Sequence, residues 1–364
     1  MRIVAVGDVG VVDNMIHIGD EAMFEAATVQ LRARGVDQVT AVSANPVDTA
    51  ARYQLAAIHR ADQDAVREAI RSSDAVIVTG GGNLSSLWPQ HILQRSAIGK
   101  LAAEYRRPLV VTGQTIGPHL DGGDQDLVRA LLNAAQLVGL REGRSYALCE
   151  QLGVRSELLN HTVDDASYLV TDSPETAPYC LVTFANHVGD ADRDAVESAL
   201  ARLLDHVADT TGLAIRFTAH FGSIVAGPAR GDEAMHERVA ARMRATYEVV
   251  PTTDSRASAR LARNAALVVC SRYHPAVFAV SAGVPTIGIS VDDYTDTKLS
   301  GALGNFGQTS VLSTTALLGS EATALVERTW AARDAIRGAE LAISATARAA
   351  STAWWDDVAA ALRG

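Results

Sequence analysis

The chain has 364 residues, of which 48% are hydrophobic and 20% are charged, and its formal net charge is −10 at pH 7. The length is about twice that of a usual domain and no polar tract is long enough to resist burial, so we expect an ordered protein with two domains. The negative charge excludes a broad surface for nucleic acid or anionic lipid, because these partners require clustered positive charge. An anionic ligand must therefore be held by a few local cations.

The cysteines and the amino terminus narrow the class of protein further. Cys149, Cys180 and Cys270 share no metal-ligand spacing, and two of them lie in apolar, strand-like runs, so we interpret all three as buried free thiols. The first residues form a strand-like run without the pattern of a secretory signal, and no stretch reaches transmembrane length. We expect a cytoplasmic location.

Short β-branched runs alternate with longer amphipathic segments in the first half of the chain. Strands are predicted at 2–6, 38–43, 74–80 and 108–114, and long helices at 20–35 and 90–107. This alternation is typical of βαβ units around a buried parallel sheet.

A run with two prolines and several polar residues, 170–179, interrupts this pattern, and we place the domain boundary there. A second series of strands is predicted at 179–186, 214–220, 265–271 and 285–290. The last segment, 318–364, is rich in alanine and arginine and has helical periodicity. The sequence thus predicts an α/β protein with two doubly wound Rossmann-like domains that face each other across a cleft, followed by helices.

Ligands of such folds bind at the carboxyl ends of the strands, where loops lead into helices. Asp20 follows the first strand and either caps the next helix or orients or deprotonates a sugar hydroxyl. His17 lies in the same loop and is either structural or part of the site. Asn83, in the glycine-rich loop 80–86, and Gln114 offer uncharged polar groups that suit a sugar, unless these loops are only tight turns.

The glycine-rich loop 80–86 does not match the two common nucleotide-binding patterns. It lacks the spacing of the dinucleotide-binding G-x-G-x-x-G and the Gly-Lys-Ser/Thr of a Walker A loop. The sequence therefore argues against a nicotinamide cofactor and against ATP.

Two strand-to-helix junctions carry potential cations. Arg141 lies where a strand becomes a helix, so it either binds an anion or forms an ion pair. Pro275 fits the first turn of another helix, with Arg272 and His274 at its entrance, where free N–H groups favour a phosphate or carboxylate. The alternative is a capped helix with a surface arginine and a packed histidine.

Lys298 is one of only two lysines in a chain that otherwise uses arginine. It follows the strand predicted at 285–290, in a helix that we expect to begin near Asp296. From there Lys298 could join Arg272 and His274 around one anion.

These motifs resemble those of the polysaccharide pyruvyl transferases, which carry pyruvate from phosphoenolpyruvate onto sugar hydroxyls as a ketal. Each motif is short, but their order and spacing together are specific. The matching motifs are GDEAM (19–23), GGGNL (80–84), GQTIGP (113–118), LREGRS (140–145), DDASYL (164–169), SRYHPAVFAVSAGVP (271–285) and the segment around Lys298.

The resemblance implies a GT-B-like fold, with residues 1–172 as the acceptor-side domain, 178–317 as the donor-side domain, and the helices of 318–364 packing on both. It also implies that Arg272 and His274 bind the anionic groups of the donor. Arg141 and Lys298 would assist them.

We assign His274 as general acid or phosphate ligand and Asp20 as general base. His17, Asn83 and Gln114 are the candidate acceptor-binding residues. The family commonly has an asparagine two residues before its Gly-Asp-Glu, where this chain has His17, so we expect a remodelled acceptor side.

The implied reaction needs an acid and a base but no metal or redox cofactor, with phosphoenolpyruvate as co-substrate. The partners would be phosphoenolpyruvate and a glycan or lipid-linked oligosaccharide of a cell-surface or exopolysaccharide, and no nucleic acid. Peripheral membrane association through the acceptor stays open. So does a homo-oligomer through the apolar segment with Trp354 and Trp355.

The main alternative is a GT-B glycosyltransferase that uses a nucleotide-sugar donor. Retaining members usually place glutamates in the helix that holds the donor, whereas the run 275–283 contains no acidic residue. A sugar-nucleotide epimerase has the same gap, and a non-catalytic glycan-binding relative is the third alternative.

Overall fold

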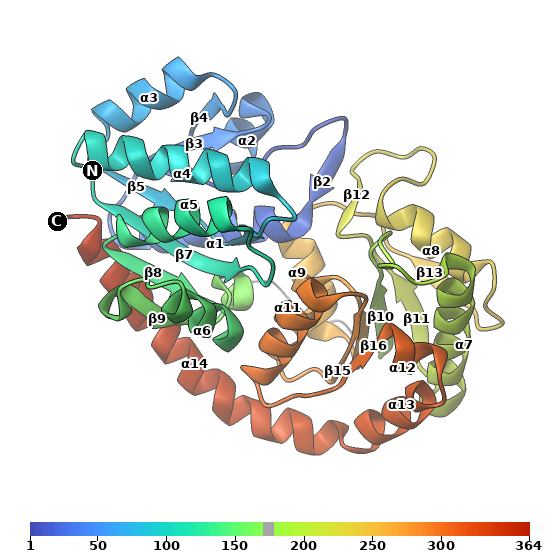
Figure 1. The fold of residues 1–364 in the computed structure, drawn as a ribbon. Coiled ribbons are helices and arrows are strands. Elements are labelled where there is room, and N and C mark those ends of the chain that lie inside the picture. Colours follow the sequence, from blue (N-terminus) through green and yellow to red (C-terminus); the bar gives the residue numbers. More distant parts are fainter. Residues whose placement is uncertain (170–177) are drawn as a thin grey trace. The chain divides into compact units, whose positions relative to one another are not determined.

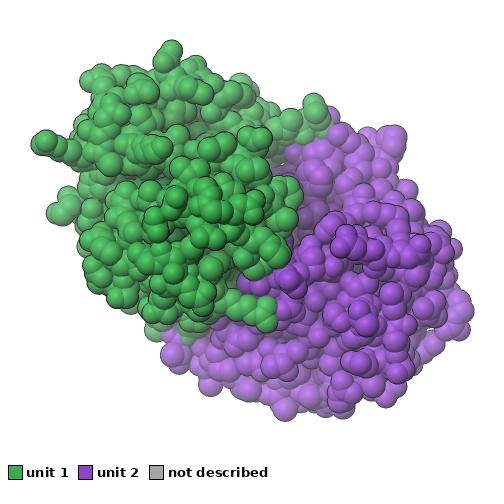
Figure 2. Space-filling model, viewed as in Figure 1, with its two compact units in different colours: residues 1–13, 20–166, 347–364 green, residues 14–19, 167–346 purple. Residues whose placement is uncertain are grey.

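The computed structural model describes residues 1–169 and 178–364, which form two compact units (Figures 1 and 2). Unit 1 comprises residues 1–13, 20–166 and 347–364, and unit 2 comprises residues 14–19 and 167–346. Most of the predicted domain boundary, residues 170–177, lies outside the described residues.

Unit 1 is built around a parallel sheet with the strand order β4-β3-β1-β5-β7-β8-β9, and β6 pairs with β7 beside this path. Its strands are β1 (Arg2–Val6), β3 (Gln38–Ser43), β4 (Ala56–His59), β5 (Ala75–Val78), β6 (Gly81–Leu84), β7 (Leu109–Ile116), β8 (Leu137–Leu140) and β9 (Leu159–His161). Its helices are α2 (Pro46–Tyr53), α3 (Gln63–Ser72), α4 (Pro89–Glu104), α5 (Gly122–Asn133) and α6 (Gly143–Gln151), together with most of α1 (Ile18–Ala33).

The alternation of side chains along β1 explains the two layers of core in unit 1. Val4 and Val6 belong to a buried cluster with apolar residues of α3, α4 and α5. Ile3 and Ala5 belong to a second cluster, which contains Phe24 of α1 and the C-terminal tryptophans. A strand that is buried on both faces needs apolar residues at every position, which is why these strands read as continuous hydrophobic runs.

Unit 2 contains a six-stranded parallel sheet with the order β13-β11-β10-β14-β15-β16. Its strands are β10 (Tyr179–Thr183), β11 (Ala214–Phe217), β13 (Tyr247–Val249), β14 (Leu267–Cys270), β15 (Thr286–Ser290) and β16 (Val311–Ser313). A separate antiparallel pair joins β2 (Met15–His17) to β12 (Phe221–Ser223). The helices are α7 (Arg193–Thr211), α8 (Asp232–Ala240), α9 (Ser255–Asn264), α10 (Tyr273–Val280), α11 (Asp293–Gly304), α12 (Thr314–Leu318) and α13 (Glu321–Ala331), with the first part of α14 (Arg333–Ala361).

Each sheet has one point at which the direction of strand addition reverses. In unit 1 the chain adds β3 and β4 on one side of β1 and then returns to place β5 on the other side. In unit 2 the corresponding neighbours are β10 and β14. Ligands of doubly wound folds bind outside the carboxyl ends of the strands at such a point. The two switch points are therefore where candidate sites should lie.

Several predicted boundaries need correction. The first helix begins at Ile18, so Asp20 is its third residue and not its cap, and α11 begins at Asp293, behind an Asp292 capping box, rather than near Asp296. Residues 14–19, predicted as part of the N-terminal domain, belong to unit 2 because Met15–His17 pairs with β12. The helical C-terminal segment is present, and its end, 347–364, belongs to unit 1.

Two other sequence expectations can be compared with the structure. All three cysteines are buried and free, as expected. Over residues 1–169 and 178–364, no helix combines the length and apolar character needed to cross a bilayer.

Candidate active site

The turn between β14 and α10 lies at the switch point of unit 2. Arg272 is the residue before α10 and has an extended backbone, with no side-chain cap on the helix. The backbone N–H groups of Ser271 and Arg272 both donate to the carbonyl oxygen of Thr183, the last residue of β10, at 3.0 and 3.4 Å. The ends of two neighbouring strands thus fix the position of Arg272.

Asp232, the first residue of α8, holds the side chain of Arg272. The Arg272 Nε lies 2.9 Å from Oδ2 of Asp232, and Nη2 lies 2.5 Å from Oδ1, which is a two-point ion pair. Asp232 is fully buried and also accepts hydrogen bonds from the backbone N–H groups of His220 and Phe221. Burial alone would raise the pKa of Asp232, but the charge and hydrogen bonds of Arg272 outweigh it and lower the pKa.

His274, in the first turn of α10, is packed between aromatic rings and a glycine. Its ring lies 5.1 Å from that of Tyr273 and 5.9 Å from that of Phe278, centroid to centroid. A β-carbon on Gly19 would overlap the Nδ1 atom of His274. The glycine of the motif GDEAM (19–23) is therefore needed in unit 2 to leave room for this imidazole.

His220 is a second histidine in the same place. Its ring lies 6.1 Å from that of Phe278, so Phe278 contacts both imidazoles. Burial, together with the neighbouring His274, holds the pKa of His220 well below its ordinary value, so His220 is neutral. Neither of its ring nitrogens has a hydrogen-bond partner among the described residues.

Lys298, on α11, lies beside the same helix entrance. Its ammonium group is 4.0 Å from the ring centroid of Tyr294 and 5.7 Å from that of Tyr273, the first residue of α10. Three of the predicted donor-binding residues, Arg272, His274 and Lys298, therefore gather around the start of α10.

His17 belongs to this group of residues rather than to the other predicted acceptor-binding residues. It lies opposite Phe221 in the β2–β12 pair, and the two rings are 4.5 Å apart. The guanidinium carbon of Arg272 lies 6.0 Å from the centroid of the same Phe221 ring. Phe221 thus lies near both the exposed His17 and the guanidinium of Arg272.

Unit 1 contains Asp20 on α1, Asn83 on β6 and Gln114 on β7, so the two amides lie in strands and not in the predicted loops. Gln114 is buried and donates through Nε2 to the carbonyl oxygen of Thr79 at 2.6 Å. Its Oε1 atom and the Nδ2 atom of Asn83 both face Gly81, and neither atom has a hydrogen-bond partner within the described part of the chain. These two amides are suited to bind a polar ligand.

Arg141 is buried in unit 1, where it is already engaged. Its Nη1 atom lies 2.7 Å from Asp164, and its Nε atom lies 3.1 Å from Glu142 and 2.9 Å from the hydroxyl of Thr115. The structure therefore places this predicted donor-binding residue in a buried polar network, in a different unit from Arg272.

Sequence reasoning missed a buried arginine in unit 1. Arg95 of α4 is 1% exposed, and its Nη1 atom contacts Nδ1 of His91 at 3.0 Å. Burial lowers the pKa of its guanidinium, while the nearby charges of Asp8 and Asp20 act in the opposite direction. Nothing in the sequence marks Arg95, because an arginine in an amphipathic helix usually reaches solvent.

Asp232 was also missed, although the sequence contains a signal for it. The pentapeptide GDEAM occurs twice, at 19–23 and at 231–235, and each copy lies at the start of a helix. The first copy supplies Gly19 and Asp20, and the second supplies the carboxylate that holds Arg272.

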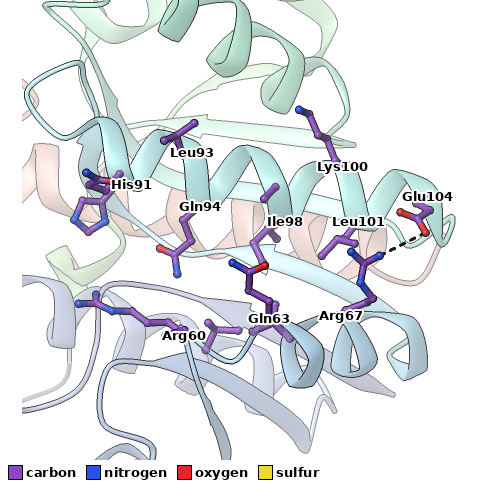
Figure 3. A pocket seen from close by; sticks show the side chains of 15 residues that line it. Arg60, Gln63, Arg67, His91, Leu93, Gln94, Ile98, Lys100, Leu101 and Glu104 are labelled. Atoms are coloured by element: carbon purple, nitrogen blue, oxygen red, sulfur yellow. Dashed lines mark ion pairs between the residues drawn. The ribbon is translucent and has the colours of Figure 1, made fainter.

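A groove in unit 1 is separate from all the predicted site residues. It lies between α3 and α4, has a volume of about 910 Å³ and is lined by side chains such as Arg60, Arg67, His91 and Lys100 (Figure 3). Arg67 and Glu104 form an ion pair at 3.8 Å within it. None of the residues predicted to bind donor or acceptor lines this groove.

Solved structures resemble the whole chain at low sequence identity. Anabaena Alr3699/HepE in complex with UDP-glucose has 13% identity and a TM-score of 0.60, over 99% of this chain and 98% of that one. UDP-GlcNAc 2-epimerase from Neisseria meningitidis, bound to UDP-GlcNAc, has 10% identity and a TM-score of 0.58, over 93% and 94%. The calicheamicin glycosyltransferase CalG4 has 15% identity and a TM-score of 0.55, over 100% and 98%. Likeness at these identities shows the fold alone, which is the predicted GT-B class.

The sequence itself matches a family and no individual curated protein. A search of curated proteins finds no match. The family described as polysaccharide pyruvyl transferase matches residues 17–293, which is more than half of the chain. The matched region runs from His17 through Arg272 and His274 and ends just before Lys298. This chain belongs to the polysaccharide pyruvyl transferase family.

Proposed function

We propose that this protein transfers pyruvate from phosphoenolpyruvate to two hydroxyls of one sugar, forming a ketal and releasing phosphate. The observation that carries the proposal is the gathering of Arg272, His274 and Lys298 at the start of α10. Phosphoenolpyruvate is small and multiply anionic, so it requires several convergent cations, and a chain with a net charge of −10 must supply them in one place.

The proposed reaction begins with protonation of phosphoenolpyruvate and ends with closure of the ketal. A proton adds to the methylene carbon of phosphoenolpyruvate, and the cationic C2 centre that forms is attacked by one sugar hydroxyl, which loses its proton. The C2–O bond to phosphate then breaks, with the electron pair leaving on the phosphate oxygen. A second hydroxyl attacks C2, loses its proton and closes the ketal. The reaction thus needs a general acid and a general base.

We assign the acid to a residue at the switch point of unit 2 and the base to a residue of unit 1. His274 is buried at the start of α10 and serves as the acid or as a phosphate ligand, while Arg272 grips the anion with a guanidinium that Asp232 holds in place. Asp20 serves as the base. His17, Asn83 and Gln114 are proposed to contact the acceptor, and Arg141 to assist the donor.

We further propose the class of acceptor and the compartment in which the reaction takes place. The acceptor is a sugar of a cell-surface or exopolysaccharide glycan, free or lipid-linked, and the donor implies that the reaction takes place in the cytoplasm. No further cofactor enters the proposed reaction.

The composition of α10 favours this donor over a nucleotide sugar. The helix has the sequence YHPAVFAV and offers no carboxylate to accept hydrogen bonds from the hydroxyls of a ribose or a donor sugar. Although solved structures of the same fold contain UDP-sugars, their likeness to this chain extends to the fold only.

The proposal is tested by thermal unfolding in the presence of phosphoenolpyruvate and, separately, of UDP-glucose and UDP-GlcNAc. We expect phosphoenolpyruvate to raise the melting temperature, because a ligand that binds only the folded state stabilises it. The variant Arg272→Ala should lose this shift, whereas Arg202→Ala, an exposed arginine of α7, should retain it. Stabilisation by UDP-sugars alone would overturn the proposal.

A further inference from the structure

Three buried polar side chains lie where β10 and β11 end, beside the switch point of unit 2. Thr183 is the last residue of β10, Thr218 directly follows β11, and His220 lies two residues further on. Their exposed fractions are 0%, 1% and 3%. The Thr183 and Thr218 hydroxyls and both His220 ring nitrogens have no hydrogen-bond partner anywhere in the described ranges.

The backbone brings the two threonines together. Val182 lies opposite Phe217 in the β10–β11 register, and the N–H of Thr218 donates to the carbonyl oxygen of Val182 at 3.1 Å. The residues that follow this pair, Thr183 and Thr218, are therefore neighbours at the edge of the sheet. The carbonyl oxygen of Thr183 also accepts the N–H of Arg272.

His220 is tied to the same place through Asp232. The buried carboxylate of Asp232 binds both the backbone N–H of His220 and the guanidinium of Arg272. The imidazole of His220 shares Phe278 with that of His274 and interacts electrostatically with it. His220 is thus a neighbour of the proposed acid and of the proposed donor clamp.

Unpaired buried polar groups are costly, since each gives up its hydrogen bonds to water and gains none in the protein. Valine in place of either threonine would have nearly the same shape and would avoid this cost. The clustering of three such side chains at a switch point indicates that a ligand provides their missing hydrogen bonds.

We infer that Thr183, Thr218 and His220 form the subsite for the carboxylate group of the donor, beside the residues that bind its phosphate. The inference rests on the proposed function and adds to it the division of the donor between two sets of residues. Hydroxyl groups and a neutral imidazole N–H can donate to carboxylate oxygens without bringing further charge into the buried site. Arg272 and Lys298 then remain for the phosphate.

The test compares three variants with wild type: Thr183→Val, Thr218→Val and His220→Leu. Calorimetric titration measures their affinities for phosphoenolpyruvate, for pyruvate, which has the carboxylate alone, and for inorganic phosphate. We expect each variant to bind phosphoenolpyruvate and pyruvate about tenfold more weakly, because one hydrogen bond to a charged group is lost. The affinity for phosphate should stay within about twofold of wild type, since no hydrogen bond to it is removed.

The melting temperatures of the ligand-free variants distinguish a ligand-binding role of these side chains from a structural role. Removing an unpaired polar group should leave the melting temperature unchanged or raise it, whereas removing a bonded group lowers it. The controls are Thr210→Val and His206→Leu on α7, whose side chains contact each other at 3.3 Å, and both should bind all three ligands as wild type does. If His220→Leu does not fold, the two valine variants decide the test.

Unchanged affinity for phosphoenolpyruvate and pyruvate in the folded variants would overturn the inference. An equal loss of phosphate affinity would overturn it too, because the subsite would then not be specific for the carboxylate. A wild-type protein that binds UDP-glucose and not phosphoenolpyruvate would contradict the proposed function. If the proposed function fails in this way, variants that lose affinity for pyruvate but not for phosphate still support the carboxylate subsite. A wild-type protein that does not bind pyruvate overturns the subsite as well.

Discussion

Gly19 illustrates how one residue can connect a sequence motif to the proposed chemistry. It precedes Asp20 in the first GDEAM motif, and it lies against the imidazole of His274 within unit 2. The motifs GDEAM (19–23) and SRYHPAVFAVSAGVP (271–285), which are far apart in the sequence, are thus in contact through Gly19 and Nδ1 of His274. A side chain at position 19 and an undisturbed His274 are mutually exclusive.

We therefore expect Gly19→Ala to displace His274. The overlap should lower the free energy of unfolding by about 1–3 kcal/mol, as overpacking usually does, and should abolish stabilisation by phosphoenolpyruvate. Urea denaturation and the thermal shift measure the two effects. Gly122→Ala is the matched control, because a β-carbon at Gly122 meets no atom within 4 Å. A Gly19→Ala variant that still responds normally to phosphoenolpyruvate would contradict the packing described for His274.

Asp165 makes the stability of unit 1 depend on pH. Burial, reinforced by the charge of Asp164, raises the pKa of Asp165 to about 8, although the hydroxyl of Thr112 donates to its carboxyl oxygens. The folded state therefore holds this proton at pH values where the unfolded state has released it. Stability falls as pH rises from about 4 to about 8.

Asp165→Asn should remove this dependence on pH. Relative to wild type, we expect the variant to gain about 1.4 kcal/mol of unfolding free energy for each pH unit between about 4 and 8. Urea denaturation at several pH values within this range measures the difference. A difference between variant and wild type that does not change with pH would contradict the raised pKa.

The gathering of Arg272, His274 and Lys298 at one place could largely be predicted from the sequence, whereas the residues that support them could not. Arg272, His274 and Lys298 follow strands, and the carboxyl ends of parallel strands meet at one edge of a sheet. His220 also follows a strand, but its burial depends on Phe278 from a distant part of the chain. The role of Asp232 is recognisable only by comparing the two GDEAM motifs, because an acidic residue at the start of a helix is ordinarily a surface residue.

Among the elements, α8 and α10 are coupled through the Asp232–Arg272 pair. The first residue of one helix binds the side chain that precedes the other, and Asp232 is fully buried. A buried ion pair contributes little net stability, but removing one member leaves the other charge without compensation. The pair therefore fixes geometry more than it stabilises the fold.

We expect Asp232→Asn to lower the free energy of unfolding by about 1–3 kcal/mol, because charge-assisted hydrogen bonds are lost while the Arg272 side chain, 26% exposed, keeps part of its hydration. The double variant Asp232→Leu with Arg272→Leu should recover most of this loss, because two apolar side chains can replace a buried pair, but it should not bind phosphoenolpyruvate. Urea denaturation and calorimetric titration measure the two effects. Full stability in Asp232→Asn, or donor binding by the double variant, would contradict the role given to the pair.

Element by element, the long apolar strands were predictable and the short antiparallel pair was not. Central strands such as β5 (AVIV) and β14 (LVVC) are continuous apolar runs that are buried at every position, as strands covered on both faces are. The strands β2 and β12 have three residues each, and their pairing joins segments that are distant in the sequence. The start of α10 was correctly predicted from Pro275, which lies in the first turn of the helix that begins at Tyr273, although this helix has no side-chain cap.

At the scale of the whole molecule, the two units are not separated by a single boundary in the sequence. Residues 14–19 belong to unit 2 and residues 347–364 to unit 1, so the chain passes between the units four times. Composition marks none of these crossings except the proline-containing run near residue 170. Of the residues proposed to contact the acceptor, His17 therefore belongs to unit 2, whereas Asn83 and Gln114 belong to unit 1.

The net charge of −10 bears on how this chain could bind an anionic donor. With 42 acidic and 32 basic side chains, the protein as a whole repels anions, so the proposed binding of phosphoenolpyruvate requires a few fixed cations. We propose that these cations lie at the start of α10, and a co-crystal structure can locate the bound ligand directly.

The decisive measurement is a crystal structure of the protein with phosphoenolpyruvate. We predict the phosphate within hydrogen-bonding distance of Arg272 and Lys298, beside His274, and the carboxylate within hydrogen-bonding distance of Thr183, Thr218 and His220. Phosphoenolpyruvate ordered elsewhere, for example in the groove between α3 and α4, would contradict it. So would crystals that bind UDP-glucose at the start of α10 and leave phosphoenolpyruvate unbound.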